Sequence, residues 1–421
     1  MRRLADDVRA DVLLGEGRLT EPQLDRLAEH LAAFHASLDG TVAVATPFGA
    51  PDAIAKNVRE NFAQGHGAAA SHLNEHDAAR IEQDQTRFLE RERALFEERA
   101  RSGRVRDGHG DLRLEHVYFE SESKPPTIID CLEFNDRFRY ADVCADVAFL
   151  SMDLRRLGRT DLAERFVASY ARASGDYELY RLLAFYEGYR AYVRGKVSAF
   201  LVDAPDTDAE ARLAADRDAR EYFLLSLLES RPPMLGPSLI AVGGIIASGK
   251  STVAERLAAA VGAPSVSADR TRKELLGVEA TKAVTENAWQ GAYSAEFTER
   301  VYGELGRRAS AVLASGRSVI LDASFRSRAL REGARDVARR SGVGFVFVET
   351  RASPDESRRR LAERARHRSV SDGRAELYDE FVARFEPVDE LGPGERFVVN
   401  TERALDDELR AVLAVVPAWP G

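Results

Sequence analysis

A glycine-rich turn in the second half of the chain constrains its fold more than any other feature. Residues 244–251 run Gly-Ile-Ile-Ala-Ser-Gly-Lys-Ser and fit the pattern G-x-x-x-x-G-K-[ST]. The apolar run 239–242 before it predicts a strand, and residues 251–261 after it predict a helix. Glycines let backbone N–H groups curl around phosphate oxygens, and the positive N-terminus of the next helix points at the same anion. This context predicts a phosphate-binding loop made of Gly244, Ile245, Ile246, Ala247, Ser248, Gly249, Lys250, Ser251 and Thr252.

Two side chains at the end of this loop predict its ligand. Lys250 can reach the β- and γ-phosphates of a nucleoside triphosphate, and the hydroxyl of Ser251 can ligate Mg²⁺. We therefore expect ATP and Mg²⁺ as cofactors, and we expect Lys250 to act on the phosphoryl group that is transferred.

The chain after residue 238 alternates between predicted strands and helices. The strands are expected at 239–242, 265–267, 318–321, 345–349 and 397–399. Such alternation indicates a parallel sheet with helices on both faces, so we expect a three-layer α/β/α domain.

Two carboxylates follow strands of this sheet. Ligands of an open parallel sheet bind beyond the carboxyl ends of its strands, so Asp269, after the second strand, is expected beside the loop. There it could accept a proton from a substrate hydroxyl, or it could cap a helix. Arg272 could hold an anionic group of the substrate, or it could be a solvated helix residue. Asp322 ends the third strand and could position Mg²⁺, the alternative again being a helix cap.

Arginines crowd a later segment of this domain, at Arg358, Arg359, Arg360, Arg364, Arg366 and Arg368. A run of like charge is usually a solvated face. It could equally form a mobile lid whose cations neutralise the charge on a transferring phosphoryl group. Arg360 and Arg364 stand four apart on one helix face, so we expect these two to make that contact.

The order and spacing of these motifs resemble the small-molecule P-loop kinases, the group that includes gluconate kinase and the kinase domain of polynucleotide kinase. The resemblance covers roughly residues 238–415. It implies that Asp269 is the catalytic base and that Arg272 contacts the substrate, since Asp269-x-x-Arg272 looks like the Asp-x-x-Arg of polynucleotide kinase and its relatives.

The first half of the chain has a different sequence pattern. Residues 1–100 and 145–230 show helical periodicity, and a short strand is expected at 127–129. Histidines and carboxylates gather between the helical parts, in His109-Gly110-Asp111, at His116 and at Asp130. One aspartate can orient a hydroxyl while a second binds Mg²⁺, so this cluster also suits phosphoryl transfer. The prolines of 230–237 break any helix, so we expect two domains, 1–232 and 238–421.

This cluster resembles the aminoglycoside phosphotransferase family, a branch of the protein-kinase-like fold. That family has His-Gly-Asp-x-x-x-x-Asn, then Ile-Asp-x-x-Glu, then an Asp-x-x-x-Asp element. The resemblance implies that Asp111 is a catalytic base, that Asp130 binds a metal and that Asp146 ties down the catalytic loop. His116 stands where the family has asparagine. The resemblance covers a second kinase lobe only, because no first-lobe strand pair or phosphate-binding lysine is recognisable before residue 100.

The whole arrangement resembles a bacterial two-domain family, in which an aminoglycoside-phosphotransferase-like domain is fused to a P-loop kinase or ATPase domain. The segment 185–196, Phe-Tyr-Glu-Gly-Tyr-Arg-Ala-Tyr-Val-Arg-Gly-Lys, looks like that family's pattern before the domain boundary. By this resemblance the chain is a member that lacks the first kinase lobe.

Charge and composition exclude several classes of protein. The net charge of −9 argues against a nucleic-acid or membrane-surface binder. Two cysteines in 421 residues make no disulfide framework. No apolar run is long enough for a membrane span, and the start lacks the apolar core of a signal peptide. These features predict a cytoplasmic protein.

Together these features predict an ATP-dependent phosphotransferase. The acceptor is expected to be a hydroxyl of a small polar metabolite, and the N-terminal half is expected to hold a second, degenerate phosphotransferase-like site. Two other functions stay open from the sequence. One is a polynucleotide 5′-hydroxyl kinase, and the other is an ATP-binding regulatory protein gated by nucleotide.

Overall fold

The computed structural model describes residues 3–229, 236–282, 290–364, 366, 370–371 and 373–416. It divides into two compact units: unit 1 comprises Met1–Ser174 and Leu182–Pro232, and unit 2 comprises Gly175–Arg181 and Pro233–Gly421. The proline-rich linker predicted at 230–237 falls mostly on residues 230–235, which lie outside the described part. In the described residues, no helix is long and apolar enough to cross a membrane.

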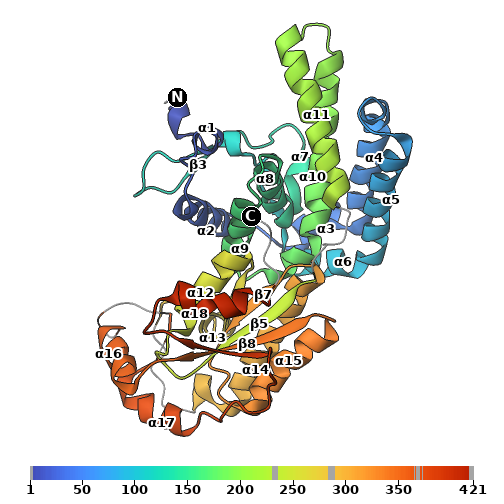
Figure 1. Cartoon of the computed structure of the whole chain (residues 1–421). Coiled ribbons are helices and arrows are strands. Elements are labelled where there is room, and N and C mark those ends of the chain that lie inside the picture. Colours follow the sequence, from blue (N-terminus) through green and yellow to red (C-terminus); the bar gives the residue numbers. More distant parts are fainter. Residues whose placement is uncertain are drawn as a thin grey trace. The chain divides into compact units, whose positions relative to one another are not determined.

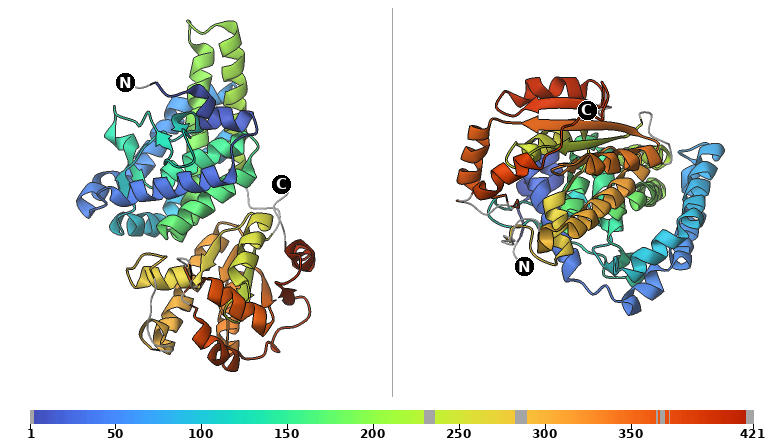
Figure 2. Two further views of the ribbon diagram at one scale, coloured as in Figure 1. Left: turned by 90° about the vertical axis from the view of Figure 1, so that its left-hand side faces the viewer. Right: turned by 90° about the horizontal axis from the view of Figure 1, so that it is seen from below.

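Unit 1 is mostly helical, as predicted. Its helices are α1 (Ala10–Gly15), α2 (Glu21–Ser37), α3 (Val42–Gly49), α4 (Pro51–Ala70), α5 (Glu75–Arg91), α6 (Arg93–Arg101), α7 (Asp136–Arg139), α8 (Cys144–Arg156), α9 (Thr160–Ser174), α10 (Tyr180–Asp203) and α11 (Ala209–Glu229). A capping box between Thr20 and Gln23 starts α2, whose leucines at helical spacing pack on α9. Helices α10 and α11 lie side by side as a long antiparallel pair (Figure 1; Figure 2, left). Tyr192 of α10 packs against Phe223 of α11.

Two small antiparallel ribbons interrupt the helices of unit 1. Strand β1 (Val105–Asp107) pairs with β4 (Tyr140–Asp142), and β2 (Val117–Tyr118) pairs with β3 (Thr127–Ile128). The segments that join these strands carry the histidines and carboxylates of the predicted N-terminal site. Among the described residues before Val105, the regular elements are helices, as the sequence predicted.

Unit 2 is built on one parallel sheet of five strands. The strands are β5 (Ser238–Gly243), β6 (Ser265–Ser267), β7 (Val319–Asp322), β8 (Gly344–Arg351) and β9 (Arg396–Asn400), in the order β6-β7-β5-β8-β9. All the pairings are parallel, which confirms the predicted sheet. The strand before the glycine-rich loop is therefore central, with Val242 opposite Asp322 of β7.

Helices cover both faces of this sheet (Figure 1). On one face, α12 (Lys250–Val261) and α18 (Leu405–Leu413) share a core with Ile240 and Val242 of β5. On the other, α14 (Ala295–Ala314) and α15 (Arg328–Arg340) pack against the central strands. Helices α13 (Ala268–Leu275), α16 (Pro354–Arg364) and α17 (Tyr378–Ala383) surround the carboxyl ends of the strands. These ends form the edge at which the predicted site residues meet.

Candidate active site

The glycine-rich loop joins β5 to α12 and has the tight backbone that its sequence predicts. Gly244 and Gly249 have φ values of 150° and 89°, and Ala247 has a φ of 58°. A positive φ in a residue other than glycine stores strain, and such residues concentrate at functional sites. A side chain at Gly244 would also collide with Thr350, since a Cβ there would lie 2.5 Å from the threonine Oγ1. The loop thus needs glycine both for its backbone and for its contact with β8.

Lys250 and Ser251 extend from the start of α12 into the site. The Lys250 Nζ donates a hydrogen bond of 2.7 Å to the carbonyl of Ile245, which keeps the ammonium folded over the loop. The Ser251 Oγ donates to Asp322 Oδ2 at 2.8 Å. The helix-cap alternative for Asp322 is wrong, because Ser327 occupies the N-cap position of α15.

Ser251 and Asp322 fit a magnesium ion in their chemistry. Mg²⁺ prefers oxygen ligands and usually takes one or two from the protein, completing its shell with phosphate oxygens and water. A hydroxyl bonded to a carboxylate beside a phosphate-binding loop supplies such a pair. The structure therefore brings together the two side chains of this half that the sequence assigned to the metal.

The ionisable groups of this site perturb each other. Burial raises the pKa of Asp322 to about 6, and nearby Asp269 adds to the rise, while Lys250 and the bond from Ser251 oppose it. Burial also lowers the pKa of Lys250, against the attraction of Asp322 and Asp269. Perturbed pKa values of this kind concentrate at functional sites, because such sites bring charges together away from water.

Asp269 and Arg272 enter the same cavity from α13. The helix-cap alternative for Asp269 is wrong, since Ser267 is the N-cap and its hydroxyl accepts a hydrogen bond from the amide of Arg270. Arg272 is only 6% exposed, and its guanidinium lies 4.7 Å from the ring centre of Tyr293. One of its NH groups donates to the carbonyl of Ala292, whereas its Nε has no hydrogen-bond partner. Arg272 is therefore not the solvated helix residue of the alternative.

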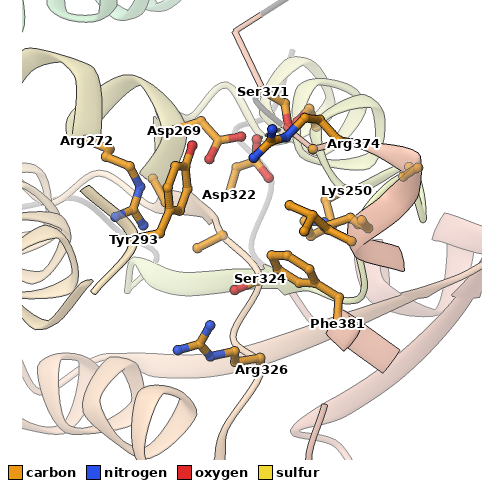
Figure 3. Close-up of a pocket in the computed structure, with 18 of the residues that line it drawn as sticks. Lys250, Asp269, Arg272, Tyr293, Asp322, Ser324, Arg326, Ser371, Arg374 and Phe381 are labelled. Carbon is orange, nitrogen blue, oxygen red and sulfur yellow. Dashed lines mark hydrogen bonds between the residues drawn. The ribbon is translucent and has the colours of Figure 1, made fainter. Parts of the chain in front are cut away.

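A single cavity collects most of these side chains. Figure 3 shows Asp269 and Asp322 close together, with Lys250 on one side and Arg272 with Tyr293 on the other. The residues with charged or hydroxyl groups that line the cavity include Lys250, Ser251, Thr252, Asp269, Arg272, Tyr293, Thr298, Tyr302, Asp322, Ser324, Arg326, Arg364, Ser371 and Arg374. Seven of these were not predicted from the sequence: Tyr293, Thr298, Tyr302, Ser324, Arg326, Ser371 and Arg374.

Ser324 and Arg326 follow the third strand of the unit so closely that the rule used for Asp322 could have found them. They flank Phe325, which has a φ of 47°. The amide of Phe325 donates to the hydroxyl of Tyr302 at 3.0 Å, and Arg331 donates to its carbonyl at 3.0 Å. These bonds hold the turn in a conformation that a bulky residue rarely adopts. For Tyr293 and Tyr302, which belong to no motif, the sequence carries no comparable signal.

The two predicted lid arginines differ in what they line. Arg364 lines the cavity with Lys250, as expected of a residue that contacts the phosphoryl group. Arg360 does not line it; its guanidinium donates to Thr401 Oγ1 at 2.9 Å and to the carbonyl of Ala247 at 3.3 Å. Both arginines line a second hollow beside the loop, together with Thr252.

The remaining arginines of this segment behave differently. Arg358 pairs with Asp379, and Arg359 pairs with Glu356 and Glu363 on the surface. Arg366 is exposed, and Arg368 lies outside the described residues. Arg358 and Arg359 therefore lie on the solvated face that a run of like charge predicts, where each pairs with nearby carboxylates.

The N-terminal cluster of unit 1 is centred on Asp146 of α8. Its carboxylate accepts hydrogen bonds from the amides of His109 at 2.7 Å and Gly110 at 2.8 Å, and lies 3.2 Å from His35 Nε2. Burial alone would raise the pKa of Asp146, but the bonds from His35 and the backbone hold it at about 2. These are the bonds expected of a residue that ties down the His109–Asp111 loop.

Asp111 and Asp130 lie on either side of His116. The Nδ1 of His116 donates to the carbonyl of Asp111 at 2.8 Å, and its Nε2 lies 3.4 Å from Asp130 Oδ2. Asp111 Oδ2 accepts from Arg113 at 3.2 Å, so the predicted base is already paired with a cation. The Asp130 side chain is 75% exposed and its φ is 63°. In the described part of the chain, no group of three or more His, Cys, Asp or Glu side chains is arranged to hold a metal ion.

Comparisons with known proteins cover both units. The model of a family described as "Phosphotransferase enzyme family" matches residues 2–186, and that of a family described as "AAA domain" matches residues 239–388. In the solved structures, a gluconokinase from Sinorhizobium meliloti 1021 is 25% identical, with a TM-score of 0.31 over 42% of this chain and 91% of its own. The Mycobacterium tuberculosis APS kinase in complex with AMPPNP and APS is 20% identical, with a TM-score of 0.31 over 44% of this chain and 98% of its own.

Longer matches come from mycobacteria. An uncharacterized protein of Mycobacterium tuberculosis (strain H37Rv) is 33% identical over 404 residues, which cover 94% of this chain and 78% of that protein. An uncharacterized protein of Mycobacterium bovis matches to the same extent. The chain therefore belongs to the same family as these mycobacterial proteins, and in it a segment of the phosphotransferase enzyme family precedes an AAA domain.

Proposed function

We propose that unit 2 transfers the γ-phosphate of ATP to a hydroxyl group of a small polar metabolite. One observation carries the proposal: Lys250, Asp269, Asp322 and Arg364 line a single cavity beyond the carboxyl ends of a parallel sheet. This set combines a phosphate-binding cation, a metal-binding carboxylate, a second carboxylate and a further cation, which are the parts that phosphoryl transfer needs.

The nucleotide is held by the glycine-rich loop and by the hollow beside it. Backbone amides of Gly244–Thr252 and the N-terminus of α12 receive the phosphates, while Lys250 exchanges its bond to Ile245 for a bond to phosphate. Ser251 and Asp322 would hold Mg²⁺, which neutralises charge on the β- and γ-phosphates. The nucleoside extends into the hollow lined by Thr252, Arg360 and Leu405, where the guanidinium offers a flat face to the base.

The chemical step needs a base and cations that stabilise charge. Asp269 accepts the proton as the acceptor oxygen bonds to the γ-phosphorus, and the bond from that phosphorus to the bridging oxygen of ADP breaks. The products are a phosphate monoester and ADP, and the proton passes from Asp269 to solvent. Lys250 and Arg364 stabilise the charge that spreads over the transferring group.

The acceptor occupies the part of the cavity away from the loop. Arg272, Tyr293 and Arg326 line this part. Figure 3 places Arg272 on the side of Asp269 and Asp322 away from Lys250, and Arg326 beyond Ser324. Hydroxyl, aromatic and guanidinium groups suit a polar molecule, and the buried Arg272 favours one with an oxyanion.

In unit 1, we propose that the His109–Asp130 region is a degenerate phosphotransferase site. Asp111 is paired with Arg113, and His116 supplies ring nitrogens where Mg²⁺ prefers oxygen. Asp146 keeps its structural bonds, so the loop is maintained without the arrangement that catalysis needs.

The test is a transfer assay with γ-labelled Mg·ATP and panels of hydroxylated metabolites. The proposal predicts a labelled phosphate monoester with the wild type and with Asp111→Asn, formed at least about 10²-fold more slowly with Asp269→Asn. A labelled product from Asp269→Asn that Asp111→Asn removes would place the transfer in unit 1. Stoichiometric nucleotide binding without a product from any acceptor would favour the regulatory protein instead.

A further inference from the structure

Unit 1 contains a cavity to which no function has been given above. It lies between α3, α4, the β4 region and α10, and its walls include Phe48, Asn57, Tyr140, Tyr186, Tyr189 and Arg190. Four of its residues, Phe185, Tyr186, Tyr189 and Arg190, come from the 185–196 segment that the sequence singled out. None of Asp111, His116 and Asp130 lines it.

Arg190 is the feature of this cavity that requires an explanation. Arg190 is 7% exposed, and its Nε has no hydrogen-bond partner. The guanidinium lies 4.9 Å from the ring centre of Phe149. Among the described residues, it forms no ion pair with a carboxylate. Arginine stays charged at any pH that a folded protein tolerates, so this is a buried cation without a counter-charge.

The other charges around the cavity are already compensated. Asp142 accepts two hydrogen bonds from Arg99, at 2.6 and 2.7 Å. Arg137 pairs with Glu60 at 2.7 Å. Arg190 therefore gives the cavity an excess of positive charge. Burying an unpaired charge costs free energy, and an oxyanion on the guanidinium would offset that cost with charge-assisted hydrogen bonds.

The rest of the lining indicates the body of the ligand. The rings of Phe48 and Tyr140 are stacked, with centroids 4.8 Å apart and planes 20° apart. Ile54 and Val58 add apolar surface. Asn57 lines the cavity too, and its Oδ1 is buried without a donor. The cavity measures about 40 Å³, so it suits a small anion, and a hydroxyl group on that anion would satisfy Asn57.

From these observations we infer that this cavity binds a small organic anion, whose carboxylate or phosphate pairs with Arg190 and whose donor group bonds to Asn57. The site is separate from the nucleotide loop of unit 2 and does not depend on the function proposed there. The apolar walls exclude water from the ion pair, and such exclusion strengthens the selectivity for a charged ligand over a neutral one.

The probes are glycolate and its neutral analogue ethylene glycol, with methyl phosphate as the phosphate counterpart. The full chain is titrated calorimetrically in saturating Mg·ADP, so that anions cannot occupy the glycine-rich loop. The expected result is that at least one of the two anions binds and that the neutral alcohol binds about tenfold more weakly or not at all. If neither anion binds, or if the alcohol binds as well as the tighter-binding anion, the inference is overturned.

Two variants locate the binding. Arg190→Met keeps an unbranched apolar side chain and removes the charge, so it should abolish anion binding without lowering the unfolding midpoint of the ligand-free protein. Arg194→Met is the matched control, because Arg194 lies one turn further along α10 and packs on Tyr222 at 5.8 Å without lining the cavity. Anion binding that survives Arg190→Met, or that Arg194→Met removes equally, contradicts the assignment. If Arg190→Met fails to fold, Arg190→Lys replaces it. This variant keeps the charge but loses the fork of donors, so anion binding at this cavity should weaken, whereas binding in the unit 2 cavity would not change.

Discussion

The two halves of the chain carry similar chemistry but arrange it differently. In unit 2, Asp269 and Asp322 line one cavity with Lys250, and Asp322 is bonded to Ser251 beside the phosphate-binding loop. In unit 1, Asp111 is paired with Arg113 and Asp130 extends into solvent. Two carboxylates of a known motif are thus insufficient for a site, because catalysis also needs converging cations in a shielded place.

The strained residues show the same contrast. Ala247 and Phe325 hold unusual backbone conformations in unit 2, and hydrogen bonds or packing on several sides fix both turns. Asp130 holds a similar conformation in unit 1, but its side chain is largely exposed. The shielded turns of unit 2 aim side chains into the cavity, whereas the turn at Asp130 leaves its carboxylate mostly in solvent, 3.4 Å from His116.

The largest difference between the two halves is expected when the proposed base of each site is removed. Asp269→Asn should lower the rate of phosphoryl transfer by about 10²- to 10⁴-fold, since it removes general base catalysis while keeping the shape of the side chain. Asp111→Asn should change the rate less than about twofold. Single-turnover assays measure both rates, and Mg·ATP affinity serves as the control for intact binding. Equal losses in the two variants would mean that both halves act in catalysis.

A second comparison lies within the arginine segment. Arg364→Gln should lower kcat by about 10²-fold, because it removes a cation that faces the transferring group. Arg360→Gln should chiefly raise the KM for ATP, by about tenfold, because Arg360 lies beside the loop and not in the cavity with Lys250. Steady-state kinetics distinguish the two effects. If Arg360→Gln lowers kcat at unchanged KM, the assignment of Arg360 to the nucleoside side is wrong.

The raised pKa of Asp322 predicts how the ligand-free unit 2 responds to pH. Its ordinary pKa is 3.8 and its folded pKa is about 6. Between these values the folded chain holds a proton that the unfolded chain has released, so the free energy of unfolding should fall as pH rises from about 4 to about 6. The contribution is at most about 3 kcal/mol. Asp322→Asn should lack this fall, and denaturant titrations of both proteins across that pH range measure it. If the free energies of unfolding of the two proteins change with pH in parallel, Asp322 is not responsible for the fall.

The corresponding test in unit 1 concerns Asp146. Its lowered pKa means that the carboxylate stabilises the fold above about pH 4, and that this contribution is lost as pH falls toward 2. At neutral pH, Asp146→Asn should destabilise unit 1 by about 2 kcal/mol, because charge-assisted bonds to His109 and Gly110 are weakened. Amide hydrogen exchange of the 105–118 segment should speed up, while Mg·ATP binding stays unchanged. Unchanged exchange there would remove the structural role given to Asp146.

Much of unit 2 was predictable because its signals are local and periodic. A strand, a glycine-rich turn and a helix fix the loop, and the carboxyl ends of parallel strands must meet at one edge, which places Asp269 and Asp322. The helix caps show the limit of this approach. Asp is a good cap, but Ser267 and Ser327 hold the cap positions, and only the structure reveals which residue the chain uses.

Other parts of the candidate sites depend on long-range packing. Tyr293 precedes α14 and Tyr302 lies within it, far from any motif, and they reach the cavity because that helix packs against α13 and the sheet. Arg360 and Arg364 share a helix face, yet Thr401, after the last strand, binds Arg360, and only Arg364 reaches the cavity with Lys250. The burial of Arg190 in unit 1 likewise depends on the elements packed around it. Sequence spacing does not contain these contacts.

The most direct test of the account is the stoichiometry of Mg·ATP binding. Calorimetric titrations of the wild type, Lys250→Ala, Asp130→Ala and the double variant would measure it. The account predicts one nucleotide per wild-type chain, no binding by Lys250→Ala and unchanged binding by Asp130→Ala. Two nucleotides per chain, or binding that survives Lys250→Ala and disappears with Asp130→Ala, would show that unit 1 holds a working nucleotide site and would contradict the contrast between the two halves.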